Sequence, residues 1–262
     1  MTRTHTIALV EKVVRVVDAL KEDPNGLPLQ QIVERTGYVK SSVHRILLSL
    51  KKLGYIEQET AGGSYRLGFQ FLVLARTLAA RTEMVKSARP YLHEIVEKFG
   101  ESAYLAILRS GRGVFVEVEE PERDLRVAAP LFAEVHFHAT AAGKAMAAFL
   151  PAENRNALLQ NLQSVALTSR TRTGSPEVAR DWERVRCEGY AINDEETIPG
   201  AVFLAAPVFD SRAQVCGSIS IGMPKARYLP RVETNIVDHL KAACRDFSDR
   251  LKAAGYVHLT GN

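Results

Sequence analysis

The sequence predicts an α+β fold in which a small helical domain with a β-hairpin precedes a larger domain built on an antiparallel sheet. Three observations lead to this prediction. Apolar residues recur at helical spacing in three segments before residue 54, and from residue 102 they recur with the spacing of strands. In the rest of the chain the predicted strands and helices do not follow one another in strict alternation, which favours an antiparallel sheet over a doubly wound fold. We expect three parts, residues 1–67, 68–84 and 85–262.

The first part is predicted to contain three helices. One spans about 7–20 and ends at the turn signal Asp-Pro-Asn-Gly, 23–26. A short second helix, 29–36, is closed by Gly37, since helices often end at a glycine. The third runs from about 41 to 53, with its apolar residues on one face.

Two short extended pieces follow, 55–58 and 64–67, joined by residues that include a pair of glycines. Such a spacing suits a β-hairpin. Three helices followed by this hairpin make a winged helix-turn-helix. Winged domains bind DNA, and they also serve as protein–protein modules.

The basic residues are concentrated in the first third of the chain. The first 85 residues hold 12 Lys and Arg against eight Asp and Glu, whereas the remainder holds 22 of each, so the net charge of +4 lies there entirely. Between Arg35 and Gly54 there are five basic residues and no acid. By charge alone this is either a solvated basic face or the footprint of a nucleic-acid module.

The third helix has the residues of a DNA-recognition helix at its start. A recognition helix points its first turn at base edges in the major groove, where hydroxyl, imidazole and guanidinium groups are suitable donors. Lys40 and the hairpin residue Arg66 would reach the flanking phosphates. The DNA-contacting residues that we expect are Leu27, Lys40, Ser41, Ser42, His44, Arg45, Lys51 and Arg66.

Two amphipathic helices are predicted next, at about 68–81 and 85–99. The apolar stripe of the first is too wide for a free linker, so we expect it to pack against a partner subunit. Its members are Phe71, Leu72, Leu74, Ala75 and Leu78.

In the third part the sequence predicts a sheet with helices around it. The predicted strands are 102–108, 114–119, a weaker one at 125–128, 190–193, 201–208 and 214–221. The predicted helices are 141–150, 152–162, 176–188 and 230–254.

Composition excludes several classes. Three widely spaced cysteines with no CxxC pair argue against a disulfide framework or a zinc site and favour a reducing compartment. The first residues lack a signal-peptide core, and no apolar run is long enough to span a membrane. We expect a cytoplasmic protein without a membrane partner.

Residues 139–145, ATAAGKA, include a Gly-Lys pair but lack the earlier glycine and the Ser or Thr of a phosphate loop, which excludes that motif. Their small side chains leave two alternatives open. Unobstructed N–H groups at a helix start can bind an anion, or the alanines can permit close helix packing.

Other candidate chemistry is weaker. His136-Phe137-His138 could place two imidazoles on one strand face, but no third metal ligand is near, so we expect no metal. Residues 193–196, Asn-Asp-Glu-Glu, could supply a general base or calcium ligands, although a solvated turn is favoured. Ser218 and Ser220 share a strand face suited to a ligand. No nucleophile–base motif is evident, and we expect no cofactor and no enzyme.

Five segments together resemble the IclR family of bacterial transcription regulators: SSVHRILLSLKKLGYIE, GGSYRLG, HATAAGKAMAAFLP, GYAINDEETIPGAVFLAAPVFD and GSISIGMPKAR. Their order and spacing cover nearly the whole chain. The resemblance implies a winged helix-turn-helix, a dimerising linker helix and a GAF-like domain that binds a small organic effector.

The resemblance also implies the effector-binding residues, which are Val127, Ala141, Ala142, Asn193, Ala201, Phe203, Ser220 and Gly222. Members of the family often have Asp at the position of Asn193 and Ser at that of Gly222, and some have a smaller residue than Phe203. These departures make the site less polar. We therefore hypothesise an effector that is larger or more aromatic than a keto acid of two or three carbons.

The sequence thus predicts a ligand-responsive DNA-binding regulator, with repression favoured over activation, of a metabolic or catabolic operon. Its partners would be double-stranded operator DNA, a small organic acid or aromatic effector, and further copies of the chain in a homodimer or a dimer of dimers. Two alternatives stay open: an enzyme whose first domain only assembles it, and a constitutive DNA binder with a vestigial pocket.

Overall fold

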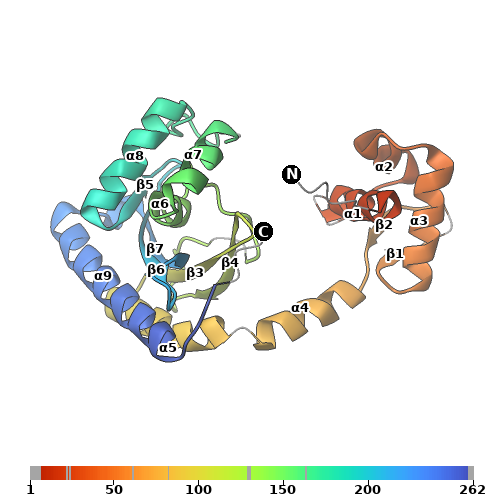
Figure 1. Cartoon of the computed structure of the whole chain (residues 1–262). Helices are drawn as coiled ribbons and strands as arrows, with labels where there is room; N and C mark the ends of the chain where they lie inside the picture. The colour runs from red at the N-terminus through yellow and green to blue at the C-terminus, as the bar shows by residue number, and fades with distance from the viewer. Residues whose placement is uncertain are drawn as a thin grey trace. The chain divides into compact units, whose positions relative to one another are not determined.

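The computed structural model of the protein describes residues 7–21, 23, 25–60, 62–81, 83–128, 131–162 and 164–258, without the side chains of 76–81 and 230–232. The chain divides into two compact units, Met1–Arg81 and Thr82–Asn262, each of which is described by itself. Figure 1 labels their helices and strands. Among the described residues, none of the helices combines the length and apolar character that a bilayer crossing needs.

The first unit is a winged helix-turn-helix followed by a further helix (Figure 1). β1 and β2 pair antiparallel, and Leu27 adds an isolated bridge to Tyr65. Its elements in chain order are α1 (Ala8–Lys21), α2 (Leu29–Thr36), α3 (Lys40–Lys52), β1 (Ile56–Gln58), β2 (Tyr65–Leu67) and α4 (Gln70–Arg81).

A compact apolar core fixes the angle between α2 and α3. Ile32 of α2 packs with Val43 and Leu47 of α3, and all three are fully buried. Gly37 ends α2 in a left-handed conformation, φ +70°, from which its N–H donates to the carbonyl oxygen of Val33. This turn directs the start of α3 away from the core.

Apolar side chains at the start of α4 and just before it lie on the surface of the first unit. Phe69, Leu72 and Leu74 are exposed, whereas Phe71 packs edge-on against Tyr55 with 5.3 Å between ring centroids. Leu78, also in the predicted stripe, lies outside the described side chains.

The second unit is built on a five-stranded antiparallel sheet of order β4-β3-β7-β6-β5. Its strands are β3 (Ser102–Arg109), β4 (Arg112–Glu119), β5 (Ala191–Asp194), β6 (Ala201–Phe209) and β7 (Val215–Pro224). Its helices are α5 (Glu83–Phe99), α6 (Ala141–Ala148), α7 (Ala152–Gln160), α8 (Ser175–Glu188), the 3₁₀ turn η1 (Lys225–Arg227) and α9 (Pro230–Ala253).

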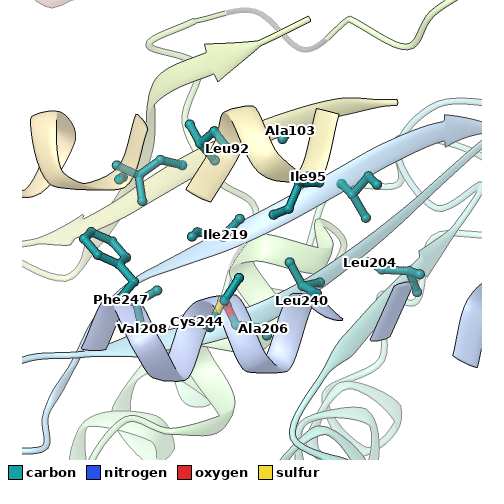
Figure 2. Packing of buried hydrophobic residues seen from close by; sticks show 14 of the residues in the cluster. Leu92, Ile95, Ala103, Leu204, Ala206, Val208, Ile219, Leu240, Cys244 and Phe247 are labelled. Atoms are coloured by element: carbon teal, nitrogen blue, oxygen red, sulfur yellow. The ribbon is translucent and has the colours of Figure 1, made fainter. Parts of the chain in front are cut away.

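Helices cover both faces of this sheet. Alternate residues of β3, β6 and β7 face α5 and α9, and Figure 2 shows Leu92 and Ile95 of α5 and Phe247 of α9 in that layer. The intervening residues, such as Tyr104 and Phe203, face α6 and α8. Because both faces are covered, β6 is apolar along its whole length.

The predicted strand at 125–128 is wrong. The backbone there forms no strand, because its carbonyl groups are paired with distant side chains. The hydroxyl of Tyr104 donates to the carbonyl oxygen of Val127, at 2.5 Å, and the guanidinium of Arg227 donates to that of Leu125, at 3.1 Å.

Candidate functional site

The first two turns of α3 present polar side chains to solvent. Lys40, Ser41, His44 and Arg45 are exposed and Ser42 is half-buried. The opposite side of the helix is held in the core, so these side chains project from a fixed support. Five of the eight predicted DNA-contacting residues therefore lie together.

The start of α3 also has backbone groups available for an anion. Val39 precedes the helix in an extended conformation, and its apolar side chain cannot cap the first turn. The N–H of Ser42 already donates to the carbonyl oxygen of Val39, at 2.9 Å. The N–H groups that come before it at a helix start lack acceptors within the helix and lie at its positive dipole end, which attracts phosphate.

The other predicted DNA-contacting residues have partners within the domain. Lys51 Nζ donates to the Gln58 side chain at 3.1 Å, and Arg66 lies 2.6 Å from Glu59. Both side chains are at the surface. Leu27 is corrected: its side chain is 1% exposed, and its N–H and carbonyl both bond to Tyr65, so it is a core residue.

A cavity of about 220 Å³ lies in the second unit, where α6 meets the sheet. Five of the eight residues that we expected to bind an effector are in its wall: Ala141, Ala142, Asn193, Phe203 and Ser220. The wall is completed by Phe115, Ala133, Glu134, His136, Thr140, Leu167, Thr197 and Ile198.

Three predicted effector-binding residues, Val127, Ala201 and Gly222, are not in the wall of this cavity. Val127 and Ala201 are buried, and Gly222 is covered by the ring of Phe203. Their assignment as effector-binding residues therefore stays a prediction.

Small residues allow the start of α6 to approach the preceding loop. Thr140 Oγ1 accepts the N–H of Gly143 at 3.0 Å and donates to the carbonyl oxygen of His136 at 2.9 Å. A β-carbon on Gly143 would lie 2.5 Å from that carbonyl oxygen, so only glycine fits. Close packing is thus part of the reason for the small residues, and the first residues of α6 also line the cavity.

The side-chain amide of Asn193 is held at both ends. Its Oδ1 accepts the N–H of Glu196 at 2.8 Å, and its Nδ2 donates to Thr197 Oγ1 at 2.7 Å. The remaining lone pair and the second amide proton are the groups with which Asn193 can meet a ligand.

Lys144 of α6, which is not in the cavity wall, is completely buried and is surrounded by charged side chains. Its Nζ lies 2.5 Å from Glu196 and 2.8 Å from Asp181, and it donates to the carbonyl oxygen of Ile192 at 3.0 Å. Arg172 lies 3.0 Å from Glu196 and 3.3 Å from Asp181. These contacts join α6, α8 and the loop after β5.

The pKa values of the two carboxyl groups in this network are shifted in opposite directions. Burial raises the pKa of Glu196 and outweighs the attraction of Lys144 and Arg172. Burial also acts to raise the pKa of Asp181, but Lys144, Arg172 and Arg184 outweigh it and hold that pKa below its usual value.

Among the residues that the structure describes, no Lys or Arg side chain lines this cavity. Burial, and next the neighbouring His138, lower the pKa of His136, so its imidazole is neutral near pH 7. His138 Nε2 lies 3.0 Å from the carbonyl oxygen of Val165. Among the described residues no three His, Cys, Asp or Glu side chains cluster as metal ligands would.

Sequence reasoning missed most of the apolar wall. Phe115, Leu167 and Ile198 come from three separate segments, and no local pattern marks them as neighbours. His136 was considered for a metal and belongs instead to the cavity.

Two family models match this chain: the IclR helix-turn-helix domain over residues 9–60, and the bacterial transcriptional regulator IclR C-terminal domain over residues 76–249. The second alone spans more than half of the sequence. The chain belongs to the IclR family.

IclR-family relatives match over most of their length. The HTH-type transcriptional regulator XynR of Escherichia coli K12 is 27% identical over 249 residues, which cover 95% of this chain and 94% of XynR. The glycerol operon regulatory protein of Streptomyces griseus is 31% identical over 226 residues, 86% of this chain and 87% of the relative. The IclR-family protein described here is accordingly a helix-turn-helix DNA-binding transcriptional regulator.

Solved structures share the IclR fold. The IclR transcriptional regulator of Alicyclobacillus acidocaldarius superimposes with a TM-score of 0.79 at 22% identity, covering 96% of this chain and 100% of that one. An IclR homologue of Microbacterium hydrocarbonoxydans, solved with 4-hydroxybenzoate, gives a TM-score of 0.75 at 21% identity and covers 94% and 100%.

Proposed function

We propose that this IclR-family protein represses a metabolic or catabolic operon, binds operator DNA through α3, and responds to a small aromatic acid in the cavity behind α6. The observation that carries the proposal is the exposed, acid-free surface on the first two turns of α3. Four hydrogen-bond donors face solvent there: Lys40, Ser41, His44 and Arg45.

Each donor has a role that its chemistry supports. The guanidinium of Arg45 suits the two acceptors of a guanine edge, and His44 and the serines suit base edges or phosphates. Lys40, at the first position of the helix, suits a flanking phosphate. Arg66 and Lys51 would contribute less, because each must first leave a partner in the domain.

Assembly is proposed to occur through α4. Exposed Leu72 and Leu74 of this helix, with Phe69 just before it, form apolar surface that a second copy would cover. A homodimer, or a dimer of dimers, would then read a pseudo-palindromic operator with half-sites spaced by turns of the DNA helix. A protein that acts on such an operator works in the cytoplasm.

The cavity supports an effector with one aromatic ring. A dry cavity of about 150 Å³ can hold benzene, and this one measures about 220 Å³, which leaves room for one or two polar substituents. Phe115 and Phe203 offer ring faces. An acidic substituent would be met by the N–H groups at the start of α6, beside Asn193 and Ser220.

The IclR homologue of Microbacterium hydrocarbonoxydans was solved with 4-hydroxybenzoate, which is a ligand of this kind. A ligand can regulate DNA binding only through different affinities for the DNA-competent and incompetent arrangements. We expect it to change operator affinity by about 5- to 150-fold.

An enzyme is the less favoured function. The run Asn193–Glu196 near Ser220 was the best candidate for a general base, but Glu196 is bound to Lys144 and Arg172, and Asn193 accepts the N–H of Glu196. Incubation of the protein with aromatic acids, followed by analysis for product, separates an enzyme from a regulator.

DNA binding is tested by fluorescence anisotropy with duplexes from the region upstream of the protein's own coding sequence. Saturable, sequence-dependent binding at low salt is expected. Failure to bind any duplex at low salt would contradict the proposal.

Effector binding is tested by calorimetry and thermal shift with benzoate and 4-hydroxybenzoate against pyruvate and glyoxylate. Aromatic acids should raise the melting temperature, because they bind only the native state. Tight binding of pyruvate or glyoxylate, with no binding of the aromatic acids, would contradict the proposal that the effector is an aromatic acid. Response to no ligand would favour a constitutive DNA binder.

A further inference from the structure

A second cavity, of about 620 Å³, lies in the second unit and shares no wall residue with the effector cavity. It is bounded by the last residues of α8, the end of β6 and the second half of α9, with Phe149 after α6. Its volume lies within the range of about 300–1,000 Å³ that is common for small-molecule sites.

This cavity exists because β5 is shorter than its neighbour. β5 pairs with residues 202–205 of β6, whereas β6 continues to Phe209. Beyond Ala205, β6 has no strand beside it on that edge among the described residues. The space between α8 and α9 is therefore not filled by the sheet.

The cavity wall carries an excess of positive charge. Its basic residues are Arg186, Lys241, Arg245 and Lys252. Two of its three acids are already satisfied: Glu188 lies 2.5 Å from Arg184, and Asp210 accepts the backbone N–H groups of Arg212, Gln214 and His258. Asp249 is the third acid, so the wall has four basic and three acidic side chains, a net charge of +1.

One of the cations is positioned by its surroundings. Lys241 Nζ lies over the ring of Tyr190, 5.3 Å from the centroid, and its stem passes close to Gly189. A β-carbon on Gly189 would stand 3.3 Å from Lys241 Cε. Lys241 is also half-buried, which limits its loss of side-chain entropy on binding.

The same cavity has an apolar part. Phe149 and Phe209 pack edge to face with ring centroids 5.4 Å apart, and Ala206 and Ala213 lie nearby in the wall. A ligand that uses the whole cavity therefore has an apolar body as well as charge.

The edge of β6 is poorly suited to an added peptide strand. Strand addition depends on free backbone N–H and carbonyl groups along the edge. Pro207 has no N–H, and the N–H of Phe209 already donates to Ser248 Oγ at 3.0 Å. These two residues favour a small molecule over an extended peptide.

We propose that this cavity is a second ligand site, for a small organic anion with an apolar body and at least two negative charges, such as an aromatic phosphate or dicarboxylate. The charge would lie between α8 and α9, at Arg186, Lys241 and Arg245, and the apolar body against Phe149 and Phe209. This site is separate from the effector cavity and does not rest on the function proposed for it.

Cys187 provides a direct readout, because it is exposed in this wall. Burial raises the pKa of Cys216 and of Cys244 to about 12, so a thiol reagent should modify Cys187 first. The rate of iodoacetamide modification of the full-length protein is measured with phenyl phosphate, phthalate, or neutral phenol. We expect saturable protection by the two dianions, with dissociation constants below about 10 mM, and none by phenol.

Variants test where the protecting ligand binds. Lys241→Gln/Arg245→Gln should weaken protection by about tenfold, whereas Arg250→Gln, an exposed α9 residue outside the wall, should not. Ala142→Phe, which fills the effector cavity, should leave protection intact. Absence of protection in the unmodified protein would overturn the proposal. So would full protection in the double variant, or an equal loss of protection in Arg250→Gln. Loss of protection in Ala142→Phe would also overturn it, because the ligand would then bind in the effector cavity. Circular dichroism of each variant establishes that it is folded.

Discussion

The ring of Phe203 occupies the space beside Gly222. The two residues are directly opposed on β6 and β7, and a β-carbon on Gly222 would lie 2.6 Å from Cε1 of the ring. These are two of the positions at which the sequence departs from the usual IclR-family pattern. The two departures depend on each other, because a side chain at position 222 and the ring of Phe203 would occupy the same space.

Gly222→Ser should therefore force the Phe203 ring toward the effector cavity. We expect a stability loss of about 1–3 kcal/mol from overpacking, and a loss of at least about tenfold in affinity for 4-hydroxybenzoate. Denaturant unfolding and calorimetry measure the two effects. Unchanged values for both would contradict the packing argument.

The matched control is Phe203→Ala/Gly222→Ser, in which the removed ring leaves room for the serine. We expect the double variant to be more stable than the sum of its single variants by about 0.5–3 kcal/mol. Its ligand preference should also move from aromatic toward smaller acids. Additive stability losses would show that the two positions are independent.

Lys144→Met should destabilise the second unit strongly. The substitution keeps most of the apolar stem but leaves Glu196 and Asp181 without their nearest cation. Removing one partner of a buried ion pair costs about 3–5 kcal/mol, and we expect the lower end because Arg172 still contacts both carboxylates. Arg172→Met, whose side chain is half in solvent, serves as the comparison and should cost less. Equal losses would show that Lys144 stabilises the network no more than Arg172 does, which would contradict the prediction.

The Lys144→Met variant should also acquire a distinct pH dependence. The pKa of Glu196 is raised by burial even with Lys144 present, and loss of that cation raises it further. A raised native pKa means that the native state binds more protons than the unfolded state, so stability is gained as pH falls. We expect the stability deficit of the variant to shrink between about pH 7 and pH 5. A deficit that is constant across this window, measured by urea unfolding, would show that Glu196 does not titrate there.

Local sequence signals were sufficient for most of the fold. Gly37 ended α2 as predicted, and the strands predicted at 201–208 and 214–221 correspond to β6 and β7. The prediction of a strand at 125–128 was wrong because the side chains that bind its backbone, Tyr104 and Arg227, are distant in sequence. Apolar alternation alone cannot distinguish a paired strand from a segment held by side chains.

The effector cavity was only partly predictable. Ala141, Ala142 and Asn193 could be assigned by resemblance because they stand within recognisable motifs. Lys144 was noticed only as part of a rejected phosphate loop, since its partners Asp181 and Glu196 follow much later in the chain. Leu27 was also placed, from the sequence, among the DNA-contacting residues, whereas its side chain is buried in the core of the domain.

Arg45→Ala should weaken operator binding by about 1–3 kcal/mol, if the guanidinium makes a bidentate base contact. The side chain is exposed, so folding should be unaffected. Anisotropy titrations with the operator and with single-base variants measure the loss and its position. Arg15→Ala on α1, also exposed, is the control for general charge loss. Equal effects of the two substitutions would remove Arg45 from base recognition.

Lys40→Ala should act on salt dependence and leave sequence preference largely unchanged. A lysine that neutralises one phosphate releases about one counterion, so its loss should lower the slope of log affinity against log salt by about 1. Titrations between about 50 and 200 mM salt, a range over which phosphate contacts strongly affect affinity, measure the slope. Discrimination between operator and mutated operator should persist at each salt concentration. An unchanged slope together with weaker discrimination between the two operators would instead assign Lys40 to a base edge. The first residue of α3 would then lie against the bases in the groove.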